Sequence, residues 1–190
     1  MVTGAVEGRY AIKTGNLHLL SPQQLVDCDT DNYGCDGGWP TYSYEYYREN
    51  GAVSEWDYSY TGYEGSCRDS SMTKLIYTAN PSYEQIESYS KEALKVALMD
   101  GPVSTIYSVG TNFYSYSTGI FTGEDIDDCG WWVNHGMVSV GYGTNSSVGD
   151  YAIVRNSWGS DWGEDGYIRI SIEGDSGACA ILYYNYYPIV

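Results

Sequence analysis

Basic residues are scarce in this 190-residue sequence. Lysine and arginine together number 9 against 25 aspartates and glutamates, which gives a formal net charge of -16. Such a charge repels phosphate backbones and anionic membrane surfaces. Long apolar runs are absent too, because no stretch approaches the roughly 20 apolar residues that cross a bilayer. We therefore expect neither nucleic acids nor membranes as partners.

Phenylalanine is scarce as well, with 2 Phe against 22 Tyr and 6 Trp. Most of the large side chains therefore carry a hydroxyl or N–H group that needs a hydrogen-bond partner when buried. Such residues suit clefts and domain interfaces. The length allows one globular unit or two packed half-domains with a sizeable core.

A secretory signal is missing, since Met1–Tyr10 lacks a charged segment followed by an apolar one. Five cysteines and the glycosylation-type triplet Asn145-Ser146-Ser147 are nevertheless typical of the secretory route. We expect that the beginning of the protein lies outside this sequence.

Helix signals dominate the first half of the chain. Ser21 precedes Pro22, and Gln24 stands at the third helical position, which is a capping-box pattern. Glycines mark several of the helix ends. We predict helices over residues 1–13, 22–26, 41–50 and 90–99.

Short runs rich in Val, Ile, Tyr and Thr, divided by glycines, follow Pro102. Helices first and strands afterwards favour an α+β protein with two segregated halves, whose interface commonly holds the site. We predict strands over residues 103–107, 137–142, 150–154 and 166–172.

Two motifs suggest chemistry. His135 enters one predicted strand, and Asn156 and Trp158 follow another at a glycine turn. A lone histidine at such a position is more often structural, but a general base needs its other ring nitrogen held in one tautomer, which an Asn oxygen achieves without adding charge. Trp158 could cover that bond from water. The nucleophile of such a pair is Ser or Cys, and a cysteine thiolate forms beside the imidazolium at a helix N-terminus.

The stretches 134–143 and 156–167 resemble the His and Asn motifs of the papain and cathepsin L family, and Leu20–Cys28 and Tyr33–Gly38 resemble its first half. The similarity covers essentially the whole chain. It implies an α+β papain-like fold with a mainly helical left half, an antiparallel β-barrel-like right half and an active-site cleft between them. The implied domains are 1–84 (left half, N-terminally incomplete), 85–185 (right half) and 186–190 (tail returning to the left half).

The resemblance implies a thiol-dependent endopeptidase. His135 would be the general base and acid, Asn156 its orienting partner, and Trp158 the indole that shields the pair and lines the leaving-group side. The family's nucleophilic cysteine would lie four positions before Met1, about 140 residues before His135, and its oxyanion glutamine in the same missing piece. The chain as given would then lack its nucleophile. The alternative is a non-catalytic homologue that binds peptides or is inactive.

The resemblance also pairs the cysteines. It joins Cys28 to Cys67 and Cys129 to Cys179, each loop worth on the order of 4 kcal/mol in the chain-entropy model. Cys35 stays unpaired because its partner in the family belongs to the missing piece. The other interpretation of Cys35 is a free buried thiol.

The resemblance also implies which individual residues contact the substrate. Gly37 and Gly38 resemble the strip that hydrogen-bonds an extended substrate backbone. The pocket for the second residue before the scissile bond has no acidic floor, so we expect it to prefer a bulky apolar or aromatic side chain and to accept Arg poorly. Tyr184 at the floor would shorten this pocket, which leaves open a preference for Leu or Val over Phe. The residues that resemble the pocket walls are Trp39, Pro40, Ile106, Val133, Gly136 and Tyr184, and Asn134 is assigned to the substrate-binding set with them.

Metal and cofactor motifs do not hold. Asp27–Asp31 begins like a calcium loop, but Asn32 and Gly38 stand where that loop needs Gly and Glu. Cys129 and His135 are too far apart for the usual zinc-ligand pairs. We expect no metal and no cofactor.

The family implies polypeptide substrates, with a propeptide and a cystatin-like inhibitor as further partners. We expect a monomer. The cysteines and the candidate glycosylation site at Asn145 favour a lysosomal, vacuolar or extracellular protein.

Overall fold

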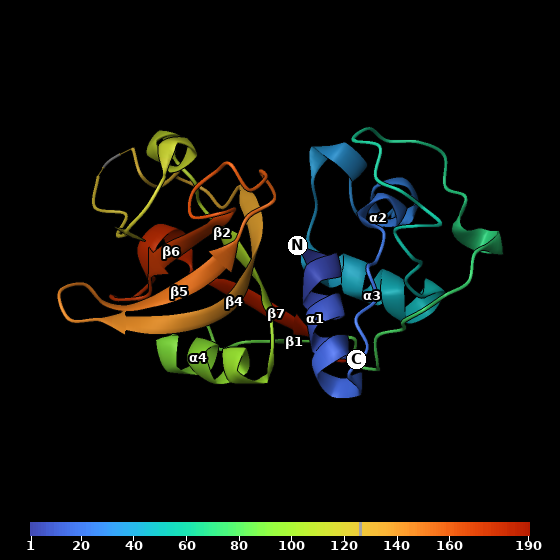
Figure 1. Ribbon diagram of the computed structural model, residues 1–190, viewed down its shortest axis with the longest axis horizontal. Coiled ribbons are helices and arrows are strands. Elements are labelled where there is room, and N and C mark those ends of the chain that lie inside the picture. The colour runs from blue at the N-terminus through green and yellow to red at the C-terminus, as the bar shows by residue number, and fades with distance from the viewer. Residues whose placement is uncertain (126) are drawn as a thin grey trace. The chain divides into compact units, whose positions relative to one another are not determined.

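The computed structural model describes residues 1–125 and 127–190, and the chain divides into two compact units (Figure 1). One, which we call the helical unit, comprises Val2–Glu84 and Pro188–Val190. The other, the sheet unit, comprises Met1 and Gln85–Tyr187.

The helical unit contains three α-helices, all at the positions predicted from the sequence. The Ser21 side chain accepts a hydrogen bond from the Gln24 backbone N–H at 2.9 Å and so caps α2. Gly15 (φ +77°) and Gly51 (φ +74°) end the other two helices in a backbone region that favours glycine. None of the described helices is long and apolar enough to cross a bilayer. The helices are α1 (Val2–Thr14), α2 (Pro22–Cys28) and α3 (Pro40–Asn50), with 3₁₀ turns η1 (Gly34–Asp36) and η2 (Asp69–Ser71).

Only half of the predicted capping box forms. The Gln24 side chain does not return to the Ser21 backbone N–H, which instead donates to the Val53 carbonyl at 3.0 Å. Gln24 is fully buried and bridges three segments: it donates to the Gly51 carbonyl and to Asp69, and it accepts from the Val53 N–H at 2.9 Å. A buried amide that satisfies three distant groups outweighs the local cap.

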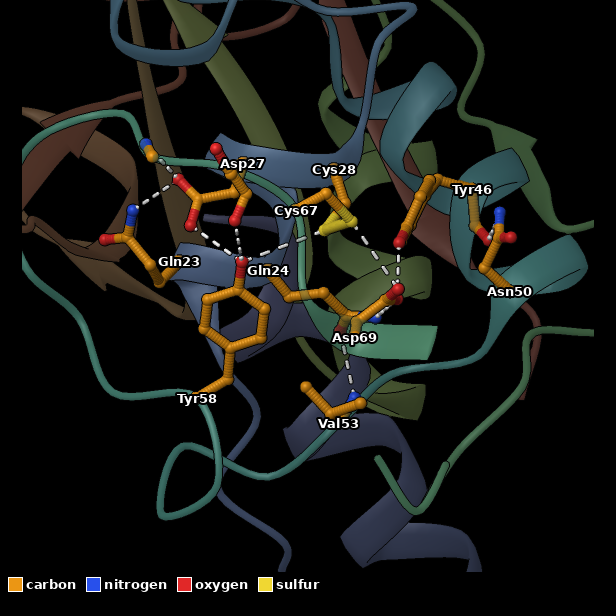
Figure 2. The surroundings of a disulfide bond; sticks show 12 residues. Gln23, Gln24, Asp27, Cys28, Tyr46, Asn50, Val53, Tyr58, Cys67 and Asp69 are labelled. Carbon is orange, nitrogen blue, oxygen red and sulfur yellow. Dashed lines mark hydrogen bonds between the residues drawn. A yellow bond between two sulfur atoms is a disulfide. The ribbon is translucent and has the colours of Figure 1, made fainter. Parts of the chain in front are cut away.

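Tyrosines and carboxylates surround the disulfide between Cys28 and Cys67 (Figure 2). The Tyr58 hydroxyl donates to Asp27 at 2.7 Å, and the Tyr46 hydroxyl donates to Asp69 at 2.7 Å. The tyrosine hydroxyls of this unit therefore find the internal hydrogen-bond partners that the Tyr-rich composition requires.

Asp69 is the centre of this network. One of its oxygens accepts from Gln24, from Tyr46 and from the Lys74 ammonium at 2.7–2.8 Å. Burial raises the pKa of the Asp69 carboxyl, but the hydrogen bonds from Lys74, Tyr46 and Gln24 outweigh it, so that its pKa lies below the ordinary value.

The sheet unit carries the strands. They form one sheet in the order β1-β7-β2-β4-β5-β6-β3, with β2, β4, β5 and β6 in antiparallel neighbour pairs and β3 parallel to β6. The strands are β1 (Tyr83–Gln85), β2 (Val103–Tyr107), β3 (Ile120–Phe121), β4 (His135–Asn145), β5 (Gly149–Arg155), β6 (Tyr167–Ser171) and β7 (Tyr184–Pro188).

The α+β class is confirmed, but the expectation of a barrel-like sheet is wrong in detail. Closure would require the outer strands β1 and β3 to pair, and no such pairing is found among the described residues. The sheet also contains a parallel contact, between Ile120 of β3 and Arg169 of β6, so it is not purely antiparallel.

Helix α4 (Lys91–Asp100) packs along the sheet against β4 (Figure 1). Ser90 caps it by accepting from the Ala93 N–H at 3.1 Å. Its apolar side, with Leu94 and Leu98, joins a core that includes Met137 from β4 and Val154 from β5. This core fixes the two strands that carry the site described below.

Replacing Asp69 by Asn should destabilise the protein by roughly 2–4 kcal/mol, because the nearly buried Lys74 loses its anion. The folded-state pKa of Asp69 is depressed, so its stabilisation is present above the unfolded value of about 4 and lost as the pH falls through the folded value. Urea unfolding from pH 3 to 7 measures both effects.

The matched control is Glu49→Gln, which removes an exposed carboxylate paired with Arg48 and should cost less than about 0.5 kcal/mol. Equal destabilisation by the two variants would contradict the role assigned to Asp69.

Candidate active site

His135 and Asn156 meet at one end of the β4–β5 pair. His135 is the first residue of β4, and Asn156 directly follows the last residue of β5. The antiparallel register, with Val138 opposite Arg155, brings these ends together. The imidazole Nε2 lies 2.9 Å from the Asn156 side-chain oxygen. The structure therefore joins the two residues that the sequence motifs singled out.

The hydrogen bond selects the tautomer of the imidazole. The Asn156 oxygen also accepts from the Ser157 backbone N–H at 2.8 Å, which orients the amide with its oxygen toward His135. Because an amide oxygen can only accept, Nε2 carries the proton and donates it. The other ring nitrogen, Nδ1, is left with its lone pair as a base.

Aromatic rings surround this pair. The Trp158 ring lies 4.9 Å from the His135 ring at an interplanar angle of 34°, and it stacks on Tyr114 at 5.0 Å. Phe113 and Trp162 meet Trp158 edge-on at 5.8 and 5.2 Å. These rings pack together beside His135, and the exclusion of water from its hydrogen bond to Asn156 by Trp158 stays a prediction.

Sequence reasoning missed Phe113, Tyr114 and Trp162. The first two lie in the 3₁₀ turn η3 (Thr111–Ser115), which carries no motif. Trp162 belongs to the Asn motif, but nothing in its position predicts that it contacts Trp158. Only the packing of the folded chain brings these rings together.

Burial lowers the pKa of the His135 imidazole below its ordinary value, and the hydrogen bond to Asn156 offsets part of that effect. An imidazole whose pKa is lowered in this way is neutral at neutral pH and able to accept a proton.

Asn156 is placed at a cost to stability. It is 8% exposed, and its side-chain nitrogen has no hydrogen-bond partner among the described residues. A buried unsatisfied amide group costs about 1–3 kcal/mol. An unsatisfied buried polar group in a native structure calls for an explanation, and a catalytic role is one such explanation.

The segment after Asn156 is held by Glu164. Its carboxylate accepts two hydrogen bonds from Arg169, at 2.6 and 2.9 Å, and further ones from Thr118 and the Gly119 N–H. These contacts, led by the one from Arg169, lower the pKa of Glu164 to about 2. The Asn156 N–H in turn donates to the Gly166 carbonyl at 3.0 Å. The loop that positions Asn156 is thus tied to β6.

Three of the predicted pocket residues lie in one row across the sheet. Ile106 of β2 is opposite Gly136 of β4 on one side and Tyr184 of β7 on the other. Val133, two residues before His135, is half-buried. The Asn134 side chain, in contrast, is engaged with Val109, from whose N–H it accepts and to whose carbonyl it donates.

The remaining predicted substrate residues belong to the helical unit. Gly37 is exposed, and no atom lies within 4 Å of where its Cβ would be. A Cβ on Gly38 would collide with the Asn32 side chain, whose oxygen accepts from the Trp39 N–H at 2.6 Å. Pro40 follows as the first residue of α3. Asn32, which sequence reasoning considered only as part of a calcium loop, shapes this strip.

The structure contains the disulfides Cys28–Cys67 and Cys129–Cys179, the pairs that the family resemblance implies. Cys35 is a free thiol and is exposed, so the interpretation as a buried thiol is wrong. Asn145 is exposed at the end of β4, where its side-chain oxygen accepts from the Ser147 N–H at 2.8 Å.

Nuclear magnetic resonance titration tests the electrostatics of His135. In this chain its pKa should lie below about 6.5, and Asn156→Leu should lower it further, because Leu keeps the site apolar but removes the hydrogen bond that raises the pKa. His18→Gln, at the second histidine of the chain, assigns the signal. A pKa unchanged by Asn156→Leu would contradict the contact.

Comparisons with known proteins agree with this geometry. The model of the papain family of cysteine proteases matches residues 1–189. The chain is 45% identical over 98% of its length to cysteine proteinase RD21A of Arabidopsis thaliana, of whose length it spans 40%. The solved structure of the bromelain protease from Ananas comosus in complex with the E64 inhibitor is 34% identical, with a TM-score of 0.90 over 100% of this chain and 86% of that one. A proform of the ragweed pollen cysteine protease Amb a 11 is 35% identical, with a TM-score of 0.90 over 100% of this chain and 57% of that one. The chain belongs to the papain family of cysteine proteases.

Proposed function

We propose that the protein hydrolyses peptide bonds through a cysteine thiolate served by His135. The observation that carries this proposal is the 2.9 Å hydrogen bond from His135 to Asn156, packed against aromatic rings at the end of the β4–β5 pair. It leaves Nδ1 of His135 as the base.

The chemistry follows from this assignment. Nδ1 takes the proton of the cysteine thiol, and the thiolate attacks the carbonyl carbon of the scissile bond. The imidazolium then gives its proton to the leaving amine, which departs as a thioester forms. His135 next takes a proton from water, whose oxygen attacks the thioester and releases the acid product while the thiol is restored. Asn156 keeps the ring in one orientation throughout.

The proposal assigns the nucleophile to a cysteine that is not among the five in this sequence. Four of the five are joined in disulfides. The remaining one, Cys35, corresponds to a disulfide position of the family and not to its nucleophile. The competing function is a non-catalytic homologue that binds peptides.

We further propose that the pocket for the second residue before the scissile bond is apolar and short. The row formed by Gly136, Ile106 and Tyr184 supports this, because it offers an aliphatic side chain, a bare backbone and an aromatic ring, and no carboxylate. Leu or Val should therefore be preferred over Phe, and Arg should be accepted poorly.

We also propose a propeptide and a cystatin-like inhibitor as partners, which the similarity to a proform and to an inhibitor complex supports. The two disulfides fit a protein outside the cytosol, and a vacuolar, lysosomal or extracellular site with glycosylation at Asn145 is part of the proposal. We also propose that the protein acts as a monomer.

His135→Ala, introduced into the complete protein with its natural preceding sequence, should lower kcat/KM for a peptide substrate by about 10³- to 10⁴-fold, because the general base and acid is lost. The assay is release of a fluorophore from a Leu-containing peptide. His18→Ala is the matched control and should retain activity. Complete protein that cleaves no peptide and reacts with no thiol-directed epoxide would contradict the proposal in favour of peptide binding.

Tyr184→Ala should shift the substrate preference toward larger residues, since removing the ring deepens the proposed pocket. The ratio of kcat/KM for Phe over Val at the second position should rise by about tenfold or more, as expected for one extra methylene-sized contact in an apolar pocket. Competition between the two peptides measures the ratio directly. A ratio that Tyr184→Ala leaves unchanged would show that Tyr184 does not line the pocket.

A further inference from the structure

Two adjacent indoles are exposed just before His135. Trp131 is 93% exposed and Trp132 is 83% exposed. Together they present on the order of 400 Å² of aromatic surface to water. Exposed apolar surface of this size on one short segment is typical of a binding site.

The segment that carries the two indoles is anchored at both ends. The Gly130 N–H donates to the Ser108 carbonyl at 2.9 Å, and the Asn134 N–H donates to the Tyr107 carbonyl at 2.8 Å. The Asn134 side chain adds two hydrogen bonds to the backbone of Val109. The indoles are therefore held on a short, fixed span, and little loop ordering is needed on binding.

The span also lies close to the general base. Only two residues lie between Trp132 and His135, and even a fully extended chain places their Cα atoms no more than about 11 Å apart. An extended peptide advances about 3.3 Å per residue. A peptide bound at His135 can thus reach the indoles within a few residues of its scissile bond.

The charge around the indoles favours a cation. The sequence has no Lys or Arg from residue 96 to residue 154. Asp127 and Asp128 lie shortly before Trp131 in the chain. They are held to the segment after β2, because the Gly110 N–H donates to the Asp128 carbonyl and the Asn112 N–H donates to the Asp127 carbonyl. Phosphate-bearing partners and anionic membrane surfaces are repelled here. A Lys or Arg side chain over an indole face is attracted.

We propose that Trp131 and Trp132 bind an Arg or Lys side chain of the polypeptide substrate, a few residues from the scissile bond and outside the apolar pocket. The inference rests on the proposed function, because it requires that substrate is bound at His135. The site contributes binding that is equal in the ground state and the transition state, so its effect appears in KM.

The experiment walks a single Arg along a Leu-containing peptide, from four residues before to four residues after the scissile bond, and compares each peptide with one that carries neutral citrulline at the same position. The complete, active protein is used, and a thiol-directed epoxide counts its active sites. At one position the Arg peptide should have a kcat/KM about three- to tenfold higher than the citrulline peptide, through a lower KM.

The double variant W131A/W132A should reduce this ratio to about one, and W131F/W132F should retain an intermediate ratio because Phe binds cations more weakly than Trp. Trp56→Ala removes an equally exposed indole, 87% exposed, from the helical unit and should leave the ratio unchanged. Cleavage of the citrulline peptides by Trp56→Ala should equal that by the unaltered protein.

An Arg-to-citrulline ratio of one in the unaltered protein, or a ratio that persists in W131A/W132A, would overturn the assignment. So would an equal loss in Trp56→Ala, since it would indicate general charge attraction. In each of these cases cleavage of the citrulline peptides leaves the proposed function intact. Failure to cleave any peptide would instead contradict both.

Discussion

The pairing of β4 with β5 is the constraint on which the candidate active site depends. His135 begins one strand and Asn156 follows the other, so their 2.9 Å contact exists only in the observed register. A slip by one residue would turn the side chains of a strand to the opposite face. The register shift between Ser139 and Gly141 lies further along β4, beyond the stretch that places His135. His135 and Asn156 lie just beyond the Val138–Arg155 pair, which ends the β4–β5 ladder on this side.

The site is supported by structure that has no part in the chemistry. The unsatisfied Asn156 amide and the exposed indoles of Trp131 and Trp132 are unfavourable for stability. Three features offset this loss of stability: the core beneath α4, the Cys129–Cys179 disulfide, and the ion pair between Glu164 and Arg169. Because these contacts surround the loops before His135 and after Asn156, they also keep the two side chains in place.

The interior of the helical unit is rich in tyrosine. Its buried hydroxyls cannot be left without partners, and carboxylates and amides supply them. Asp69 accepts from Tyr46, and Asp27 accepts from Tyr58, on either side of the Cys28–Cys67 disulfide. The same composition would be unstable in a core built only from aliphatic packing.

Much of this protein could be predicted from the sequence by itself. Helix ends were visible because Ser21, Gly15 and Gly51 act through local geometry, and strands were visible because β-branched and aromatic residues gather between glycines. His135, Asn156 and Trp158 were found because their motif is specific.

Only the tertiary structure decided the rest. Among the described residues the outer strands of the sheet do not pair. The Gln24 side chain bonds to distant backbone groups instead of the Ser21 N–H, and the Asn134 side chain bonds to Val109. Phe113 and Tyr114 pack against Trp158, although no sequence motif predicts these contacts. In each case the deciding contact joins residues far apart in the chain. A pattern of neighbouring residues determines local conformation, whereas the energy of a buried hydrogen bond or ring contact depends on which distant groups the fold brings to it.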